Sequence, residues 1–380
     1  MTGPAGVAEA ADSLAKVRES TAFGRDLAPQ PRGRDLLKPR AAAWVAIARL
    51  VCSLGAFGIP PVQQKRDHRI IRSRHFHKMQ RRHFIIFDVL PFVGTLVALG
   101  LLFYRPIGVV ELSLFFGFWL ITGLGLTVGY HRLFTHRAFA TSTAMSAILI
   151  VMGSMAGRGP MLSWAAMHRR HHELSDHDGD LHSPRLHGDG LLGRLRGFLH
   201  AHLTWMIAHD YPNVALYVPD LMANRTLVAV NSYYHSWVAL GLLLPAAIGG
   251  LATMSPWGAL TGLLWGGVVR MLVVEQTMSA INSIMHTFGA QPFVTRDDNS
   301  RNLGVMAWLA WGEGWHNNHH AFPYSAAFGL RWFEFDPGFI FIRALEALGL
   351  AWDVKVPSEE KIARRMLRQP GDAEPDLETG

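Results

Sequence analysis

Four long apolar stretches constrain this chain more than any other feature of its sequence. They run from Phe84 to Tyr104, from Pro106 to about Tyr130, from Ser236 to Met254 and from Pro256 to about Met285. Each reaches the ~20 residues that an α-helix needs to cross the hydrocarbon core of a bilayer. Only helices and closed barrels span that core, because the backbone finds no water there. The sequence therefore predicts an all-α integral membrane protein with four transmembrane helices.

The composition agrees with this fold class. Only 17% of the 380 residues are charged, below the roughly 25% that is usual in soluble domains. The fourth stretch still carries Arg270 and Glu275. Because charged side chains are costly in lipid, we expect both to face protein or the membrane interface.

Positive charge indicates the orientation. Eight Lys and Arg residues lie between residues 63 and 84, whereas the short links at Arg105 and around Ser255 hold almost none. Basic residues stay on the cytoplasmic side, so both termini are expected in the cytoplasm. The 131–233 connection and everything after residue 286 then lie there too. If the source is bacterial, the membrane is the cell membrane.

Charge and cysteine content exclude several classes of partner and cofactor. The net charge of +7 has no nucleic-acid motif beside it, so we expect no nucleic-acid partner and attribute the charge to anionic lipid headgroups. The single cysteine, Cys52, excludes an internal disulfide, a cysteine-ligated zinc site and an iron–sulfur cluster.

The ends of the chain differ from the apolar middle. Residues 1–40 are polar and indicate a disordered N-terminal tail. Residues 41–61 are apolar, but Arg49 interrupts them and they end at Pro60-Pro61, which favours a helix lying in the membrane interface over a fifth span. With the basic run that follows, they make an interfacial and juxtamembrane segment, 41–84. Residues 357–380 are predicted to be a polar C-terminal tail.

Three histidine clusters indicate a metal site: His131 with His136; His168 with His171 and His172; His316 with His319 and His320. In the second and third clusters the spacing is i, i+3, i+4, which places the imidazoles on one face of a helix. On an ideal α-helix the side chains of His131 and His136 would point in directions about 140° apart. We expect this pair where the second span ends, reaching different metals or bending back.

A fourth element lies near the end of the last span, where Asn282 and His286 are four residues apart. His286 would be a ninth imidazole, and Asn282 could bind a metal directly or through water. Nine imidazoles divided between two ions leave open positions, as a catalytic site requires. Isolated histidines such as His187, His209 and His235 are expected to be surface or hydrogen-bonded residues.

The ligand type narrows the chemistry. Soluble di-iron enzymes use carboxylate-rich ligand sets with Glu-x-x-His pairs, whereas the clusters here are rich in histidine and poor in carboxylates. Neutral imidazoles also suit iron. Two irons together can deliver two electrons to dioxygen and reach an oxidant able to break an unactivated C–H bond. Because the site lies in a membrane protein, the sequence predicts desaturation or hydroxylation of a lipid chain.

These motifs occur in longer strings. They are Gly129-Tyr-His-Arg-Leu-Phe-Thr-His-Arg137, His168-Arg-Arg-His-His172, Asn282-Ser-Ile-Met-His-Thr-Phe-Gly289 and Gly312-Glu-Gly-Trp-His-Asn-Asn-His-His-Ala-Phe-Pro323. On these strings, from about Gly117 to Val356, the chain resembles the membrane fatty acid desaturases, in particular the acyl-CoA delta-9 (stearoyl-CoA) type and its bacterial relatives.

The resemblance implies a membrane desaturase domain over residues 85–356, with four transmembrane helices under a cytoplasmic helical cap and a narrow acyl tunnel leading to the metals. It implies a di-iron centre held by His131, His136, His168, His171, His172, His286, His316, His319 and His320, with Asn282 contacting one iron through water. In such enzymes dioxygen and two electrons remove two hydrogens from a saturated acyl chain, giving a cis double bond and water.

The chain departs from the family at three points. Asp180-Leu181-His182 stands where Asp-Pro-His is usual, and Gly157-Arg-Gly-Pro160 is an unusual approach to the second cluster. The heme motif of a fused cytochrome b5 domain is missing, so we expect an external electron donor, a ferredoxin or a cytochrome with its reductase. A basic cytoplasmic face suits such an acidic carrier.

Several charged residues are candidates for supporting roles. Carboxylates orient metal-bound imidazoles by accepting the other N–H, and the candidates are Glu173, Asp176, Asp178, Asp180, Asp298 and Glu313; the alternative is a solvated loop acid. Arg169 and Arg170 could meet the phosphates of a substrate headgroup, or could be solvated arginines.

Alternatives to desaturation stay open. A hydroxylase, acetylenase or ketolase would use the same scaffold, because the histidines report the oxidant and not the bond attacked. A non-catalytic metal-binding or metal-transport protein is more distant, because transporters place their ligands at the bilayer midplane. The acyl group could ride on coenzyme A, a carrier protein or a lipid.

Overall fold

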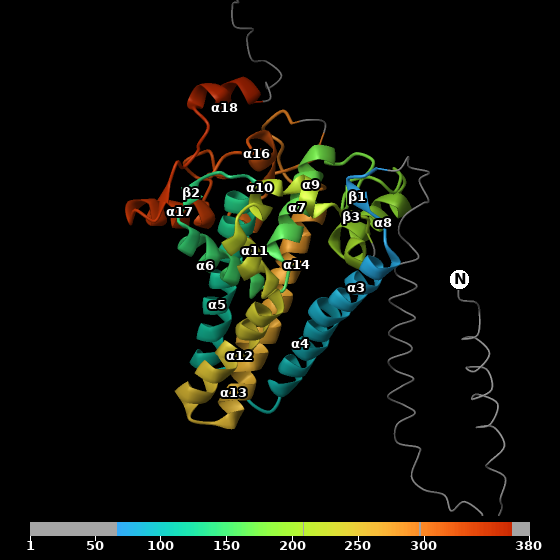
Figure 1. The fold of residues 1–380 in the computed structure, drawn as a ribbon. Coiled ribbons are helices and arrows are strands. Elements are labelled where there is room, and N and C mark those ends of the chain that lie inside the picture. The colour runs from blue at the N-terminus through green and yellow to red at the C-terminus, as the bar shows by residue number, and fades with distance from the viewer. Residues whose placement is uncertain (1–66, 208, 296–297, 367–380) are drawn as a thin grey trace, which may run out of the picture. The chain divides into compact units, whose positions relative to one another are not determined.

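The computed structural model describes residues 67–207, 209–295 and 298–366. The predicted tail of residues 1–40 and the predicted interfacial helix of residues 41–61 lie outside these ranges, as do residues 367–380 of the predicted C-terminal tail. The described chain is mostly helical (Figure 1).

Four helices are long and apolar enough to cross a membrane, as the sequence predicts: residues 74–101, 109–135, 234–253 and 256–283. The first joins α3 (Arg74–Phe84), η1 (Ile85–Val89) and α4 (Leu90–Leu101), and the second joins α5 (Val109–Leu124) and η2 (Gly125–Thr135). The third is α12 (Tyr234–Thr253), and the fourth joins α13 (Pro256–Gly262), η4 (Leu263–Val269) and α14 (Arg270–Ser283).

Two of these helices are longer than the apolar stretches that predict them. The first begins at Arg74 rather than Phe84, because Ser73 caps it by accepting a hydrogen bond from the backbone N–H of His75. The second continues past Tyr130 to Thr135. In both cases the helical hydrogen bonding runs on after the residues become polar, so hydropathy marks where lipid contact ends and not where the helix ends.

The remaining elements gather at one end of the four long helices (Figure 1). The connection between the second and third helices holds α6 (Thr143–Ser154), α7 (Met161–Leu174), α8 (Leu191–His202), η3 (Thr204–Ile207), α9 (Val214–Tyr217), α10 (Pro219–Met222) and α11 (Arg225–Ser232). The segment after the fourth holds α15 (Gly304–Leu309), α16 (His316–Ala321), α17 (Pro337–Ala347) and α18 (Glu359–Arg365). Together they form the cap over the histidine-bearing helix ends.

Two short antiparallel sheets tie distant parts of this cap together. Strand β1 (Ile70–Ile71) pairs with β3 (Tyr211–Pro212), and β2 (Ala140–Thr141) pairs with β4 (Ala351–Trp352). Close packing also fixes η2 against α6, where a Cβ atom on Gly125 would lie 2.2 Å from the backbone nitrogen of Gly153. These contacts hold η2, which carries the first histidine pair, in a fixed place.

Arg270 and Glu275 face protein, as expected. Arg270 is fully buried and donates hydrogen bonds to the carbonyls of Met155 (2.8 Å), Gly241 (2.8 Å) and Gly266 (3.1 Å). The Gly241 carbonyl needs such a donor, because Pro245 stands four residues later inside α12 and has no N–H. In a membrane an unpaired carbonyl is costly, so Arg270 repairs the helix that proline interrupts.

We therefore predict that Arg270→Leu destabilises the protein by about 2–3 kcal/mol, because buried carbonyls lose a charged donor. In detergent the melting temperature should fall by roughly 5 °C. Arg105→Leu, which removes an exposed arginine, is the control. Equal melting temperatures for the two variants would contradict this role for Arg270.

Candidate metal centre

Nine histidines form two groups in which the ring nitrogens lie within 4.8 Å of one another. The first group has five imidazoles: His131, His136, His168, His172 and His319. The second has four: His171, His286, His316 and His320. All three sequence clusters and the isolated His286 thus meet at the end of the four long helices.

The two HxxHH clusters divide their imidazoles between the groups in the same way. On α7, His168 and His172 turn to the five-histidine group and His171 to the other. On α16, His319 belongs to the five-histidine group, whereas His316 and His320 belong to the four-histidine group. Each helix therefore lies between two ligand sets, and the spacing i, i+3, i+4 serves both.

Of the two alternatives expected for His131 and His136, reaching different metals is wrong and bending back is confirmed: they belong to one group, with ring centroids 4.9 Å apart. The reason is local. Residues Gly125–Thr135 form a π-helix, and the backbone N–H of His136 bonds to the carbonyl of His131, five residues earlier. Hydrogen bonding from i to i+5 brings residues five apart onto nearly one face, and such π-turns are frequent at functional sites.

The short helix α16 is held by the two asparagines between its histidines. The Asn302 side-chain oxygen accepts the backbone N–H groups of Asn317 (2.9 Å) and Asn318 (3.3 Å). The Asn318 amide donates to Glu334 (2.7 Å) and that of Asn317 to the Phe293 carbonyl (3.3 Å). A six-residue helix has little stability of its own, so these bonds fix the directions of His316, His319 and His320.

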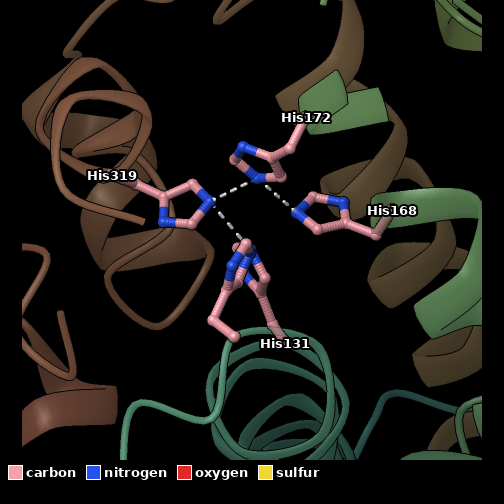
Figure 2. Close-up of side chains that lie close together, drawn as sticks. His131, His168, His172 and His319 are labelled. Atoms are coloured by element: carbon pink, nitrogen blue, oxygen red, sulfur yellow. Dashed lines mark hydrogen bonds between the residues drawn. The ribbon is translucent and has the colours of Figure 1, made fainter. Parts of the chain in front are cut away.

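The ring nitrogens converge on common points, as Figure 2 shows for four imidazoles of the first group. The Nε2 atom of His319 lies 3.0 Å from that of His131 and 2.8 Å from that of His172. In the second group the Nε2 atoms of His286 and His316 are 3.0 Å apart. Ligands about 2.1 Å from one ion and at right angles to each other have such separations.

Unpaired buried nitrogens also favour metal binding. The Nε2 atoms of His136 and His320 are buried and have no hydrogen-bond partner within the described residues. An unpaired buried nitrogen is costly, and a cation facing its lone pair removes that cost. The nine imidazoles therefore fit two metal ions, one in each group.

Four carboxylates face the outer nitrogens of these imidazoles. Each contact joins an Nδ1 atom to a carboxylate oxygen: His131 to Glu313 (2.7 Å), His171 to Asp180 (3.0 Å), His286 to Asp176 (3.0 Å) and His320 to Asp298 (3.0 Å). The three aspartate contacts are hydrogen bonds, which fix the tautomer so that Nε2 keeps its lone pair for a metal; Glu313 lies within ion-pair distance of His131 without a hydrogen bond. Thr127 in turn donates a hydrogen bond to Glu313.

The other two candidate carboxylates lie elsewhere. Asp178 is exposed, and none of its contacts within the described ranges reaches a histidine. Glu173 accepts hydrogen bonds from Arg69 and from the Tyr217 hydroxyl. From proximity in the sequence, Asp178 and Asp180 were equal candidates to face an imidazole. In the structure Asp180 faces His171.

The candidate headgroup arginines are used inside the protein. Arg169 forms a two-pronged ion pair with Asp220 (2.6 and 3.0 Å) and donates to the carbonyls of Phe134 and Tyr217. Arg170 is buried and donates to the Gly179 carbonyl and the Tyr217 hydroxyl. Both therefore brace α7 against its neighbours.

Burial keeps most ligands neutral. It lowers the pKa well below the ordinary histidine value, with neighbouring imidazoles adding to the effect, at His136, His168, His172, His316 and His319. Burial lowers the pKa of His320 to about 4, although Asp298 opposes the change. His171 differs: burial would lower its pKa, but the Asp180 carboxylate raises it above the ordinary value.

The carboxylates beside the ligands stay charged. Burial would raise the pKa of Asp176, but the facing His286 and a hydrogen bond from Ser183 lower it far below the ordinary value. His171 does the same for Asp180 against the effect of burial. Both side chains are therefore ionised at neutral pH and able to accept from imidazole N–H groups.

A cavity of about 490 Å³ reaches the metal groups. Its lining includes His131, His168 and His316 together with Asn282. Apolar side chains such as Trp164, Met278 and Ile281 line much of the rest. Trp164 stacks on His168 with ring centroids 5.0 Å apart. Asn282 thus shares this cavity with histidines of both groups.

Sequence reasoning assigned no place in this cavity to three polar residues that line it, Asp88, Arg158 and His182, although it noted the segments of the last two as unusual. His182 is buried, and its Nδ1 lies 3.9 Å from Asp180. The proximity of His182 to Asp180 in the sequence was a usable signal. Asp88 and Arg158 gave little signal, because they come from segments 70 residues apart that only the fold brings together.

Comparison with known proteins identifies the class. Residues 109–348 match the family model described as fatty acid desaturase. The chain is 46% identical over 299 residues to the hex-5-enoyl-(acyl-carrier protein) acetylenase of Moorena producens, covering 78% of this chain and 93% of that protein. It is 35% identical over 247 residues to the sn-1 stearoyl-lipid 9-desaturase of Anabaena variabilis, covering 64% and 83%.

A third relative is the probable acyl-CoA desaturase of Schizosaccharomyces pombe, 32% identical over 279 residues, covering 72% of this chain and 55% of that protein. The chain belongs to the fatty acid desaturase family. It is an integral membrane enzyme whose two histidine groups are able to bind metal, and the resemblance seen in the sequence is confirmed.

We predict that Asp180→Asn lowers metal affinity 10- to 100-fold, because His171 loses the carboxylate that orients it and makes it more basic. Asp178→Asn is the matched control, since that side chain is exposed. Metal retained against a graded chelator, counted by inductively coupled plasma mass spectrometry, measures both. Equal retention by the two variants would show that the contact has no such role.

Metal-free protein should lose stability as the pH falls from 7.5 to 5.5. The buried histidines have a folded-state pKa below the unfolded value of about 6.5, so the unfolded state binds more protons as the pH falls through 6.5. For His320 the window extends down to about 4. His171 has the opposite effect, because its pKa is raised in the folded state and its protonation therefore stabilises the fold. A melting temperature that rises or stays level on acidification would contradict this account.

Proposed function

We propose that each histidine group binds one iron ion and that the pair oxidises a fatty acyl chain with dioxygen. Two hydrogens leave adjacent carbons of the chain, which gains a cis double bond. These hydrogens, with two electrons and two protons from outside, reduce one dioxygen to two waters. The observation that supports this most is the set of nine grouped imidazoles, three of which, His131, His168 and His316, line a largely apolar cavity.

The protein residues have distinct roles in this proposal. His131, His136, His168, His172 and His319 hold one ion, and His171, His286, His316 and His320 hold the other, with Asn282 acting through a water. Iron supplies the redox chemistry that an unactivated C–H bond requires. Asp176, Asp180 and Asp298 hold imidazole protons at Nδ1, and the Glu313 carboxylate faces His131. The apolar wall at Trp164 and Ile281 holds the chain and excludes water.

A second candidate is an acetylenase, which removes two hydrogens from an existing double bond to give an alkyne. The 46% identity to a protein named as an acetylenase acting on an acyl-carrier protein substrate supports it. Both reactions need the same metal pair, and differ in which chain the cavity presents. Hydroxylase and ketolase activities would use that pair as well.

The positive charges of the protein indicate its orientation in the membrane and the kind of electron carrier it uses. We place the cap and the metal groups on the cytoplasmic side of the membrane, because the first helix begins with Arg74, Lys78, Arg81 and Arg82. In a bacterium this is the cell membrane. The two electrons come from a separate ferredoxin or cytochrome with its reductase, and a basic protein of net charge +7 suits an acidic carrier.

Expression in a host without its own desaturase tests the proposal, with total acyl chains identified by gas chromatography–mass spectrometry. We expect a new cis-unsaturated chain with the wild-type protein and none with His171→Ala. His187→Ala, which changes a histidine outside both groups, should behave as wild type.

Other products discriminate the alternatives. A new alkyne, with no new alkene from a saturated chain, would favour the acetylenase. Hydroxylated or oxo chains would favour the hydroxylase or ketolase. Unchanged acyl chains from protein that holds two irons and is supplied with an electron donor would contradict the proposal and revive a metal-binding protein without catalysis.

A further inference from the structure

The segment between the fourth span and α16 contains an uncharged run that folds back on itself. Residues 303–312 read Leu-Gly-Val-Met-Ala-Trp-Leu-Ala-Trp-Gly and include α15. The two ends of the run meet, because the backbone N–H of Leu303 donates to the carbonyl of Gly314 (2.9 Å). The chain reverses at Trp311 and Gly312, whose φ angles are 51° and 104°. We call this excursion the 303–314 loop.

The far end of the 303–314 loop lies beside the apolar part of the second long helix. The rings of Trp311 and Trp119 have centroids 4.8 Å apart, and a Cβ atom on Gly123 would lie 1.9 Å from the Trp311 ring. Residues 109–128 of this helix would supply the ~20 residues that cross the hydrocarbon, and Gly123 falls inside this range. Gly123 also comes eight residues before His131, which is about 10 Å along the helix. The loop therefore descends from the level of the histidines to the depth of the membrane.

The backbone of the loop meets the requirement of that environment. Non-helical backbone at membrane depth must be buried in protein and hydrogen-bonded. The backbone N–H of Ala310 donates to Met306 (2.8 Å), that of Gly312 to Ala307 (2.8 Å) and that of Glu313 to Ala310 (3.0 Å). The turn at residues 310–313 is buried, so its remaining polar groups are shielded from lipid.

Exposed apolar side chains gather on the outer face of this loop and on the segment before α17. The ring of Trp308 stacks on that of Phe335, with centroids 4.1 Å apart, and so joins the two segments. Trp332 is 97% exposed, more than any other large apolar side chain among the described residues. A contiguous apolar patch of this kind marks an interaction site. We call the set the aromatic collar: Val305, Trp308, Leu309, Trp332, Phe333 and Phe335.

The depth of the 303–314 loop indicates what covers the aromatic collar. We propose that the collar inserts into the lipid interface on the cap side of the membrane. Tryptophan rings are enriched in this region of membrane proteins, and Arg331, exposed beside the collar, suits the headgroup phosphates. Leu120 and Ile121, from the same stretch of the second long helix as Gly123, are exposed as lipid contact requires. The collar then lies in the membrane, although the sequence placed everything after residue 286 in the cytoplasm.

The aromatic collar is connected to the metal groups through α16. Glu334, between two collar phenylalanines, is buried and accepts a hydrogen bond from the Asn318 amide of α16 (2.7 Å). The Nε1 atom of Trp315, the residue before His316, donates to the carbonyl of Phe335 (2.9 Å). Lipid that holds the collar therefore also holds the helix that carries three of the histidines.

Spin labels measure the depth of the collar directly. Cys52→Ser removes the single cysteine of the chain, and Val305→Cys or Phe333→Cys then places one nitroxide on the collar of the full-length protein. The protein is reconstituted in nanodiscs of phosphatidylcholine and phosphatidylglycerol. Power-saturation electron paramagnetic resonance compares collisions with oxygen, which concentrates in lipid, and with a water-soluble nickel chelate. We expect both labels to favour oxygen.

Two reference labels set the scale. Phe116→Cys, at an exposed position of the second long helix, gives the value for hydrocarbon, and Glu359→Cys, exposed at the start of α18, gives the value for water. Melting temperatures equal to that of Cys52→Ser show that the labelled variants are folded. Collar labels that match Glu359→Cys would overturn the proposal. Labels shielded from both reagents would overturn it too, because a second copy or another protein would then cover the collar.

Iron retention in nanodiscs tests the connection to α16. The double variant Trp332→Ser/Phe333→Ser should lose iron to a graded chelator severalfold faster than wild type. Tyr104→Ser, which changes an exposed aromatic residue in the link between the first two spans, should behave as wild type. Equal retention by all three would contradict the connection. Neither experiment requires turnover; protein that binds no iron would count against the proposed function, and the labels alone then decide where the collar lies.

Discussion

Imidazole nitrogens that face one another across 2.8–3.0 Å in a buried site are the constraint on which the rest of the structure depends. Two neutral rings can share such a contact as an N–H···N hydrogen bond only if one carries its proton on Nε2, and burial lowers the pKa of most of them, so a second proton on the ring is disfavoured. A metal ion instead accepts the lone pairs of all the facing nitrogens at once, which fits several imidazoles that converge on one point. The cap, its asparagine-braced helix α16 and its carboxylates all act to hold these nitrogens in place.

The long helices solve a second problem, which is to bring an apolar substrate to a polar site. All four contribute residues that line the cavity: Asp88 on the first, His131 on the second, Tyr234 on the third and Asn282 on the fourth. The oxidising chemistry therefore lies where lipid meets the cap. A charged residue deeper in the bundle is tolerated where it forms hydrogen bonds inside the protein. Arg270, for example, donates to the Gly241 carbonyl, which Pro245 leaves unpaired.

The sequence predicted the four spans and all nine clustered histidines, because hydropathy and i, i+3, i+4 spacing are local properties. Predictions from the sequence were wrong where the backbone departs from regular α-helical geometry. The π-helix at Gly125–Thr135 overturned the alternative that His131 and His136 reach different metals, since an ideal α-helix was assumed. Proximity in sequence could not separate Asp180 from Asp178, which differ in direction within one turn. Asp88 and Arg158 meet only in three dimensions, so no spacing rule could pair them.

Spectroscopy of the iron-loaded protein tests the central claim most directly, because it reads the ligands and not the product. Mössbauer and X-ray absorption spectra should show two irons per chain, each bound mainly by imidazole nitrogens at about 2.1 Å. His319→Ala should alter one iron environment and His286→Ala the other. A single iron per chain, or a signal dominated by carboxylate ligands shared between the ions, would contradict the account.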